Sequence, residues 1–107
     1  MDGGKIVIRY AKAFYELAKE NKIVDVVIED VKNIITLFDE EIFIQFINNI
    51  LIRPSEKFKI INELLSENIN INTLKFLELI IKNGKENYLK RILIHVIDLY
   101  NRDNKIK

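Results

Sequence analysis

The amino-acid sequence predicts an all-α fold, a compact six-helix bundle formed by a single domain over residues 1–107. Apolar residues recur at intervals of three and four positions, which is the spacing of one face of an α-helix, and they do not alternate as in a strand. The chain contains only three Gly and one Pro, so few positions interrupt a helix. Hydrophobic residues make up 49% and charged residues 31% of the chain, a composition typical of a folded domain with one core.

The boundaries of the first four helices follow from local signals. We expect six helices, at residues 4–20, 23–38, 40–49, 54–66, 72–83 and 87–102. The pair Asn21 and Lys22 separates the first two, and the acidic run 39–41 suits the positive amino-terminal end of the third. Pro54 can open the fourth helix, where its missing N–H costs no hydrogen bond.

The fifth helix has a start signal and a stop signal of its own. Asn70 or Asn72 can cap its amino terminus with a side-chain oxygen. The Asn83–Gly84 pair is flanked by helical rather than strand spacing, so Gly84 is expected to end the helix in the left-handed conformation. The sixth helix divides evenly into an apolar face and a polar face.

Two helices carry a wider apolar arc than one core requires. In the first helix the apolar arc covers about 220° of the circumference. It divides into two stripes, one of Ile6, Tyr10, Ala13 and Leu17 and the other of Val7, Ala11, Phe14 and Ala18. The fifth helix has a narrow polar strip (Lys75, Glu78, Lys82) between Leu74, Leu77 and Ile81 on one side and Phe76, Leu79 and Ile80 on the other.

This surplus of apolar surface has two interpretations. In the first, the two helices share a core through one stripe each and present the second stripe outward, forming a groove for an amphipathic helix of a partner. In the second, both are central helices that the rest of the chain covers on most sides. The second helix also has a broad apolar arc, so the spacing of the residues leaves both interpretations open.

Three segments resemble motifs of one known family. Residues 10–18 (YAKAFYELA) resemble the first-helix motif of the delta subunit of F-type ATP synthase, whose mitochondrial counterpart is the oligomycin-sensitivity-conferring protein. Residues 49–57 (NILIRPSEK) resemble that family's turn into its fourth helix, and residues 76–85 (FLELIIKNGK) resemble its fifth-helix segment. Residues 99–101, at the end of the sixth helix, also resemble the family's sequence there. The three motifs occur in order over nearly the whole chain.

The resemblance implies the six-helix amino-terminal domain of a non-catalytic peripheral-stalk subunit, a stator that helps couple proton transport to ATP synthesis. In this family the first and fifth helices bind the amino-terminal helix of an alpha subunit. Carried over by residue, the contact face maps onto Tyr10, Ala13 and Leu79. Ile6, Leu17, Phe76 and Asn83 lie on the same stripes by helical geometry and complete the expected partner-binding set.

The resemblance also implies a location and a second partner. The family lies peripheral to the energy-transducing membrane, on the cytoplasmic side of the bacterial inner membrane or its organelle equivalent. Its carboxy-terminal domain engages b-type stalk subunits of Fo, and we expect that domain to be absent from this sequence, which ends at Lys107. Arg53 replaces a capping serine, so the fourth helix should begin on Ser55 or lack a side-chain cap. Glu86 and Tyr88 replace leucines.

No residue pattern indicates catalysis, a cofactor or a metal site. His95 is the only histidine and is expected to be exposed, because it lies on the polar face of the sixth helix. The carboxylates of residues 29–30 and 39–41 are expected to be solvated, since adjacent helical residues point in different directions. The hydroxyl groups lack a histidine base at motif spacing and are expected near helix ends or on polar faces (Thr36, Ser55, Ser66 and Thr73).

Charge and hydropathy argue against two further classes of partner. A net charge of +1 gives no electrostatic basis for binding nucleic acid. The longest uncharged run has 11 residues (42–52), too few to insert across a bilayer. One alternative of a different class remains, a helical nucleic-acid-binding or regulatory adaptor module that uses the fifth and sixth helices as a helix-turn-helix.

Overall fold

The computed structural model describes residues 3–105, so the two residues at each end of the predicted domain lie outside the described part. Its elements are α1 (Gly4–Glu20), α2 (Val24–Leu37), α3 (Glu41–Asn48), α4 (Pro54–Leu65), α5 (Ile71–Lys82), the 3-10 turn η1 (Glu86–Tyr88) and α6 (Leu89–Asp103). Residues 3–105 contain no strand, so the all-α prediction is confirmed. The first five helices begin and end within one residue of their predicted bounds, and the predicted start of the sixth is instead the 3-10 turn.

Local chemistry accounts for the helix ends. Pro54 is the first residue of α4, and Arg53 before it provides no side-chain cap, as the replacement of the family's serine predicts. The side chain of Asn70 accepts a hydrogen bond from the backbone N–H of Asn72 at 2.8 Å and caps α5. Gly84 follows α5 with φ of 70°, the left-handed conformation expected of a helix stop.

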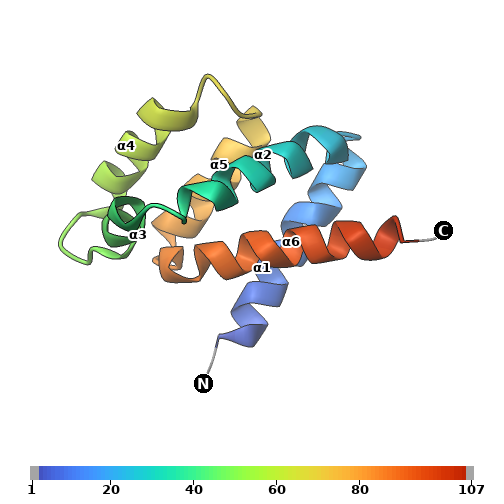
Figure 1. The fold of residues 1–107 in the computed structure, drawn as a ribbon, viewed down its shortest axis with the longest axis horizontal. Helices are drawn as coiled ribbons and strands as arrows, with labels where there is room; N and C mark the ends of the chain where they lie inside the picture. The colour runs from blue at the N-terminus through green and yellow to red at the C-terminus, as the bar shows by residue number, and fades with distance from the viewer. Residues whose placement is uncertain (1–2, 106–107) are drawn as a thin grey trace.

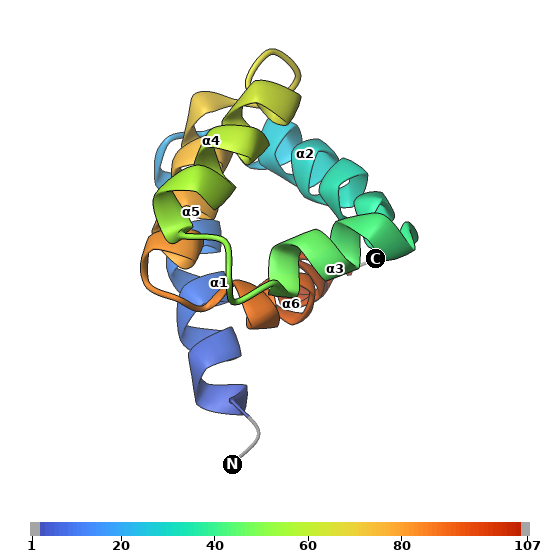
Figure 2. The same cartoon turned by 90° about the vertical axis from the view of Figure 1, so that its left-hand side faces the viewer.

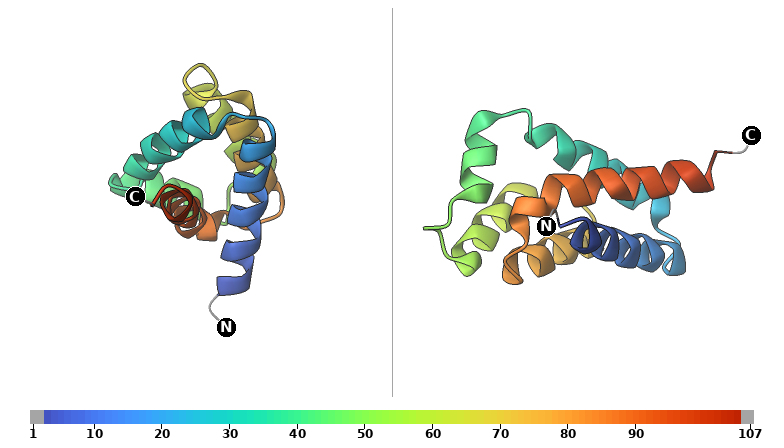
Figure 3. Two further views of the ribbon diagram at one scale, coloured as in Figure 1. Left: turned by 90° about the vertical axis from the view of Figure 1, so that its right-hand side faces the viewer. Right: turned by 90° about the horizontal axis from the view of Figure 1, so that it is seen from below.

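The long helix α6 organises the bundle. It packs against α1 on one side and α2 on the other, while α4 packs on α5 (Figure 1). Turned by 90°, α4 and α5 lie on one side of the molecule and α2 and α3 on the other (Figure 2). Seen nearly along its own axis, α6 lies between α1 and α2 (Figure 3). The molecule measures 46 × 36 × 23 Å along its principal axes.

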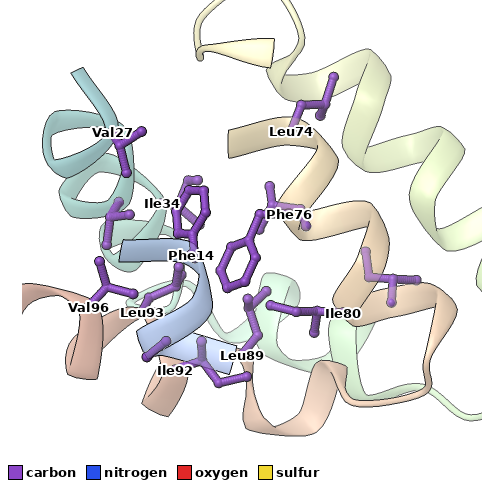
Figure 4. Packing of buried hydrophobic residues seen from close by; sticks show 14 of the residues in the cluster. Phe14, Val27, Ile34, Leu74, Phe76, Ile80, Leu89, Ile92, Leu93 and Val96 are labelled. Atoms are coloured by element: carbon purple, nitrogen blue, oxygen red, sulfur yellow. The ribbon is translucent and has the colours of Figure 1, made fainter. Parts of the chain in front are cut away.

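One hydrophobic core joins all six α-helices. The inner stripe of α1 is buried in full (Val7, Ala11, Phe14 and Ala18), and α6 contributes Ile92, Leu93 and Val96. Phe14 of α1 faces Phe76 of α5 across the middle of the core (Figure 4). The two rings stack with centroids 3.9 Å apart and planes within 5° of parallel. Each fully buried side chain of this size contributes about 1.5–3 kcal/mol of apolar transfer free energy.

One buried carboxylate, that of Asp30, corrects a sequence prediction, and its partner Thr73 is buried as well. Asp30 was expected to be solvated, but it lies buried on α2, where its Oδ2 accepts hydrogen bonds from the backbone N–H of Asn70 at 2.8 Å and from Thr73 Oγ1 at 2.9 Å. Thr73 lies near a helix end as predicted, but its side chain is buried and not on a polar face. The reason is tertiary, because a carboxylate from another helix accepts from one backbone N–H and one hydroxyl at the start of α5.

A buried lysine links three segments. The side chain of Lys57 on α4 is 1% exposed, and its Nζ donates to the carbonyl oxygen of Ile47 at 2.9 Å and to Glu86 Oε2 at 2.8 Å. Glu86, which replaces a leucine of the family, is therefore the counter-ion of a buried lysine. Tyr88, the second replacement, packs over the start of α1, where any side chain at Gly3 would overlap its ring.

His95 was predicted to be exposed and is instead half-buried. It lines a hollow between α1 and α6 together with Tyr15 and Leu99. The prediction was wrong because α6 lies across α1, so part of its polar face is covered.

Candidate partner-binding groove

An open apolar groove of about 290 Å³ runs between α1 and α5. Four of its lining residues come from α1 and four from α5. They are Tyr10, Ala13, Phe14, Leu17, Asn72, Lys75, Phe76 and Leu79. Among these lining side chains only one, that of Lys75, carries a charge.

The groove has an aromatic floor and aliphatic walls. The stacked rings of Phe14 and Phe76 form the floor, since both side chains are buried and both line the groove. Leu17 and Leu79 remain 41% and 47% exposed, so each wall presents a large apolar side chain to solvent. Ala13 is exposed between them and leaves room for another backbone to approach.

The groove forms because α1 has two apolar stripes and α6 covers only one. Positions 10, 13 and 17 lie on one stripe and positions 11, 14 and 18 on the other, and only the second is buried in full. On α5 the wide arc is used differently, because Phe76 and Ile80 are buried and only Leu79 of that stripe is exposed. The structure therefore leaves one stripe of α1 uncovered, whereas α5 is a central helix with one outward residue on the stripe of Phe76 and Ile80.

Five of the seven residues expected to bind a partner line the groove, namely Tyr10, Ala13, Leu17, Phe76 and Leu79. Asn83 lies at its end, where Nδ2 donates a hydrogen bond to Tyr10 Oη at 2.9 Å and joins α5 to α1. Ile6 is half-buried and is not among the lining residues.

Comparison with known proteins identifies the family. The family model described as ATP synthase delta (OSCP) subunit matches residues 6–107. The chain belongs to this family. The delta/OSCP fold is thereby assigned on sequence, and no solved structure matches the chain significantly.

Three curated bacterial members of the delta/OSCP family are 33% or 34% identical to this chain over the aligned residues. ATP synthase subunit delta of Trichodesmium erythraeum is 33% identical over 90 residues, which are 83% of this chain and 50% of the relative. That of Fusobacterium nucleatum is 34% identical over 100 residues, 92% of this chain and 56% of the relative. That of Clostridium beijerinckii is 33% identical over 98 residues, 89% and 55% respectively. The chain thus spans about half the length of the curated relatives it matches.

Within this delta-family groove, sequence reasoning missed Phe14, Asn72 and Lys75 as lining residues. Asn72 precedes Phe76 by four positions and Leu79 by seven, so it lies on the same face of α5 and could have been found by that spacing. Lys75 was assigned to the polar strip, and its position beside the groove follows from where α1 lies. Phe14 was assigned to the core, which it occupies while also forming the floor.

The amino-terminal end of the α5 wall is held in place by α2. Asp30 accepts hydrogen bonds from Asn70 and Thr73, and those two residues bracket the first turn of α5 next to Asn72. A buried carboxylate with two donors is a strong, directional link, because charged acceptors form stronger hydrogen bonds than neutral ones. The position of this wall is therefore fixed by the core.

A second polar contact holds α1 to the end of α6. Tyr15 Oη donates a hydrogen bond to Asp103 Oδ2 at 2.7 Å, and Lys19 Nζ lies 3.4 Å from the same oxygen. Burial, together with the hydrogen bond to Asp103, raises the pKa of the Tyr15 phenol well above its ordinary value. The hydrogen bond from Tyr15 holds the pKa of Asp103 below its ordinary value, and Lys19 acts in the same direction.

Other chemistries have no counterpart in the part of the chain that the structure describes. Residues 3–105 contain no group of three or more His, Cys, Asp or Glu side chains placed to hold a metal ion. Over the same residues, every helix is too short or too polar to cross a bilayer.

Proposed function

We propose that this chain is a non-catalytic peripheral-stalk subunit of an F-type ATP synthase that holds the amino-terminal helix of an alpha subunit in the groove between α1 and α5. The observation that carries the proposal is the groove itself. In a chain of the delta/OSCP family, it places Tyr10, Ala13 and Leu79 on the walls of one open apolar channel.

A helix in this groove would gain free energy by burying its apolar face. If it buries roughly 500–700 Å² of apolar surface, the gross stabilisation is on the order of 10–18 kcal/mol, and the loss of translational and rotational freedom reduces it greatly. The floor consists of two buried, stacked rings of this chain's own core, so binding requires little rearrangement of the core. A partly preorganised site of this kind favours slow dissociation.

The mechanism is mechanical. Rotary catalysis exerts torque on the catalytic head, and a stator has to prevent the head from turning with the rotor. A helix that dissociates slowly from its groove resists this elastic load without any chemical step. The subunit would lie peripheral to the energy-transducing membrane, on its cytoplasmic side in bacteria. Its connection to the b-type subunits would be made by the remaining half of the family's length.

The test is titration calorimetry of the whole chain with a peptide of the alpha-subunit amino-terminal segment from the same organism. Tyr10→Asp or Ala13→Trp should abolish binding, because the first places a charge in the groove and the second fills it. Ile8→Asp is the matched control, since Ile8 is an exposed apolar residue on α1 that lies outside the groove. Circular dichroism should show the same helix content in all variants. Unchanged affinity in both groove variants would refute the proposed face.

The alternative of a helical nucleic-acid-binding or adaptor module is not favoured. The family match covers both helices on which a helix-turn-helix would depend. Binding of duplex DNA that weakens steeply with salt would be the result that supports it.

A further inference from the structure

The polar groups of the groove are distributed unevenly along it. Lys75 lies toward the amino-terminal end of α5 and lines the groove as an exposed side chain. Within residues 3–105 no carboxylate lies within ion-pair distance of its Nζ. At the opposite end, Tyr10 and Asn83 form an uncharged hydrogen-bonded pair. The one cation of the groove lining therefore lies in the half of the groove nearer the start of α5, between Asn72 and Phe76, and the far end is neutral.

From this asymmetry we infer that the bound helix places a carboxylate against Lys75, and that this ion pair sets the direction and register of the helix. The inference rests on the proposed function and names the chemistry of the partner at the same site. A helix that covers the groove removes water from around the Lys75 ammonium group. An apolar cover would leave that charge poorly solvated, whereas a carboxylate compensates it.

The neutral end of the groove offers a hydrogen-bond donor as a second polar contact for the bound helix. Tyr10 Oη accepts the hydrogen bond from Asn83, so the phenol proton is free to be donated to an acceptor on the bound helix. Lys75 and Asn83 are eight residues apart, or about 12 Å along an α-helix. The bound helix should therefore carry a carboxylate opposite Lys75 and an uncharged acceptor about 12 Å farther along, opposite Tyr10.

This arrangement would act on specificity more than on gross affinity. The apolar walls accept any amphipathic helix of suitable width, in either direction. A single charge away from the centre of the groove distinguishes the two directions, because the reversed helix would leave Lys75 without a partner. Charge pairs at the edge of an interface commonly act in this way, by excluding wrong partners and registers.

The experiment is a charge-reversal cycle measured by titration calorimetry on the whole chain. The probe is the alpha-subunit amino-terminal peptide, together with variants in which each acidic residue is replaced in turn by Lys. Lys75→Glu should weaken binding of the native peptide by about tenfold or more, because like charges are then opposed. One of the peptide variants should bind Lys75→Glu better than it binds the unmodified chain. Lys82→Glu is the matched control, since Lys82 is an exposed lysine on α5 outside the groove lining.

A second variant tests the charge without reversing it. Lys75→Met keeps the aliphatic stem but removes the charge. Binding of the native peptide to this variant should therefore lose most of the salt dependence seen with the unmodified chain. If Lys75→Glu and Lys75→Met bind the native peptide as tightly as the unmodified chain while Tyr10→Asp does not bind, the ion pair is refuted and the proposed function stands. If no peptide variant restores binding to Lys75→Glu, the pairing is likewise refuted. If the unmodified chain binds no alpha-subunit peptide, the proposed function itself fails.

Discussion

Replacing Lys57 by methionine should destabilise the fold more than any other single change to a charged residue described above. Methionine preserves most of the side-chain volume but removes the ammonium group that joins α4 to Ile47 and to Glu86. The Glu86 carboxylate then remains largely buried without its counter-ion. Its Oε1 already lacks a hydrogen-bond partner, and Oε2 would lose Lys57. Neither oxygen of the carboxylate would then accept a hydrogen bond.

The expected loss follows from the cost of breaking a buried ion pair, which is about 3–5 kcal/mol when one partner is removed. Because Glu86 retains slight exposure, we expect the lower end, about 3 kcal/mol. For a domain of this size each kcal/mol lowers the midpoint of thermal unfolding by about 4–8 °C. The midpoint should therefore fall by about 12 °C or more.

The double variant Lys57→Met with Glu86→Leu separates the charge from the packing. It removes both ions and restores the leucine that the resemblance to the family leads one to expect at position 86. Replacing a buried ion pair by apolar residues of similar volume is often neutral or stabilising, so this variant should recover most of the loss. The matched control is Lys59→Met, an exposed lysine of the same helix, which should change stability by less than about 0.5 kcal/mol.

The assay is urea unfolding followed by circular dichroism, with thermal unfolding as a second measure. A Lys57→Met variant as stable as the unmodified chain would show that the ammonium group contributes nothing net. A double variant no more stable than the single one would show that the loss came from packing around Lys57 rather than from the uncompensated carboxylate.

Two further predictions concern the contacts that hold the groove walls. Asp30→Ala should cost about 1–3 kcal/mol and increase amide hydrogen exchange in the first turn of α5, because two buried donors lose their acceptor. The hydrogen bond between Tyr15 and Asp103 should hold the end of α6 between about pH 4 and pH 10. Its contribution is lost as the pH falls through the lowered pKa of Asp103, and also as the pH rises toward the raised pKa of Tyr15. Amide exchange at the last turn of α6 should show this pH dependence, and Tyr15→Phe should remove it.

The helix boundaries could be predicted because their signals are local. Pro54, Asn70 and Gly84 each act on backbone within a few residues, and each does so as predicted. The start of the last helix was missed by two residues, because η1 replaces its first turn and contains Glu86, which Lys57 holds from another helix.

Buried charges could not be predicted, because their partners lie far away in sequence. Asp30 and Asn70 are 40 residues apart, and Lys57 and Glu86 are 29 apart. A sequence read along the chain shows a charged residue on a helix and predicts solvent, which is correct for most such residues. Only the tertiary arrangement shows that the start of α5 supplies the groups that match Asp30, and that η1 and the end of α3 supply those that match Lys57.

The same limit applies to the groove. Helical periodicity gave the width of each apolar arc, but it could not show which neighbours cover the arc. On α1 the stripe with Ala13 is left open, because α6 covers the opposite stripe. On α5 almost the whole arc is covered, and Leu79 alone remains outward on its stripe.

The two walls of the groove are held by different neighbours, and this has a consequence for binding. α1 is fixed by α6 and by the contact of Tyr15 with Asp103, whereas α5 is fixed by α4 and by Asp30 of α2. Between α1 and α5 the main links are side chains, the stacked rings of Phe14 and Phe76 and the hydrogen bond of Tyr10 with Asn83. A helix bound in the groove would add a bridge between the two walls. Because the helix would bind only the native state, it should raise the free energy of unfolding of the whole domain. At helix concentrations above the dissociation constant, this increase should grow with the logarithm of the concentration.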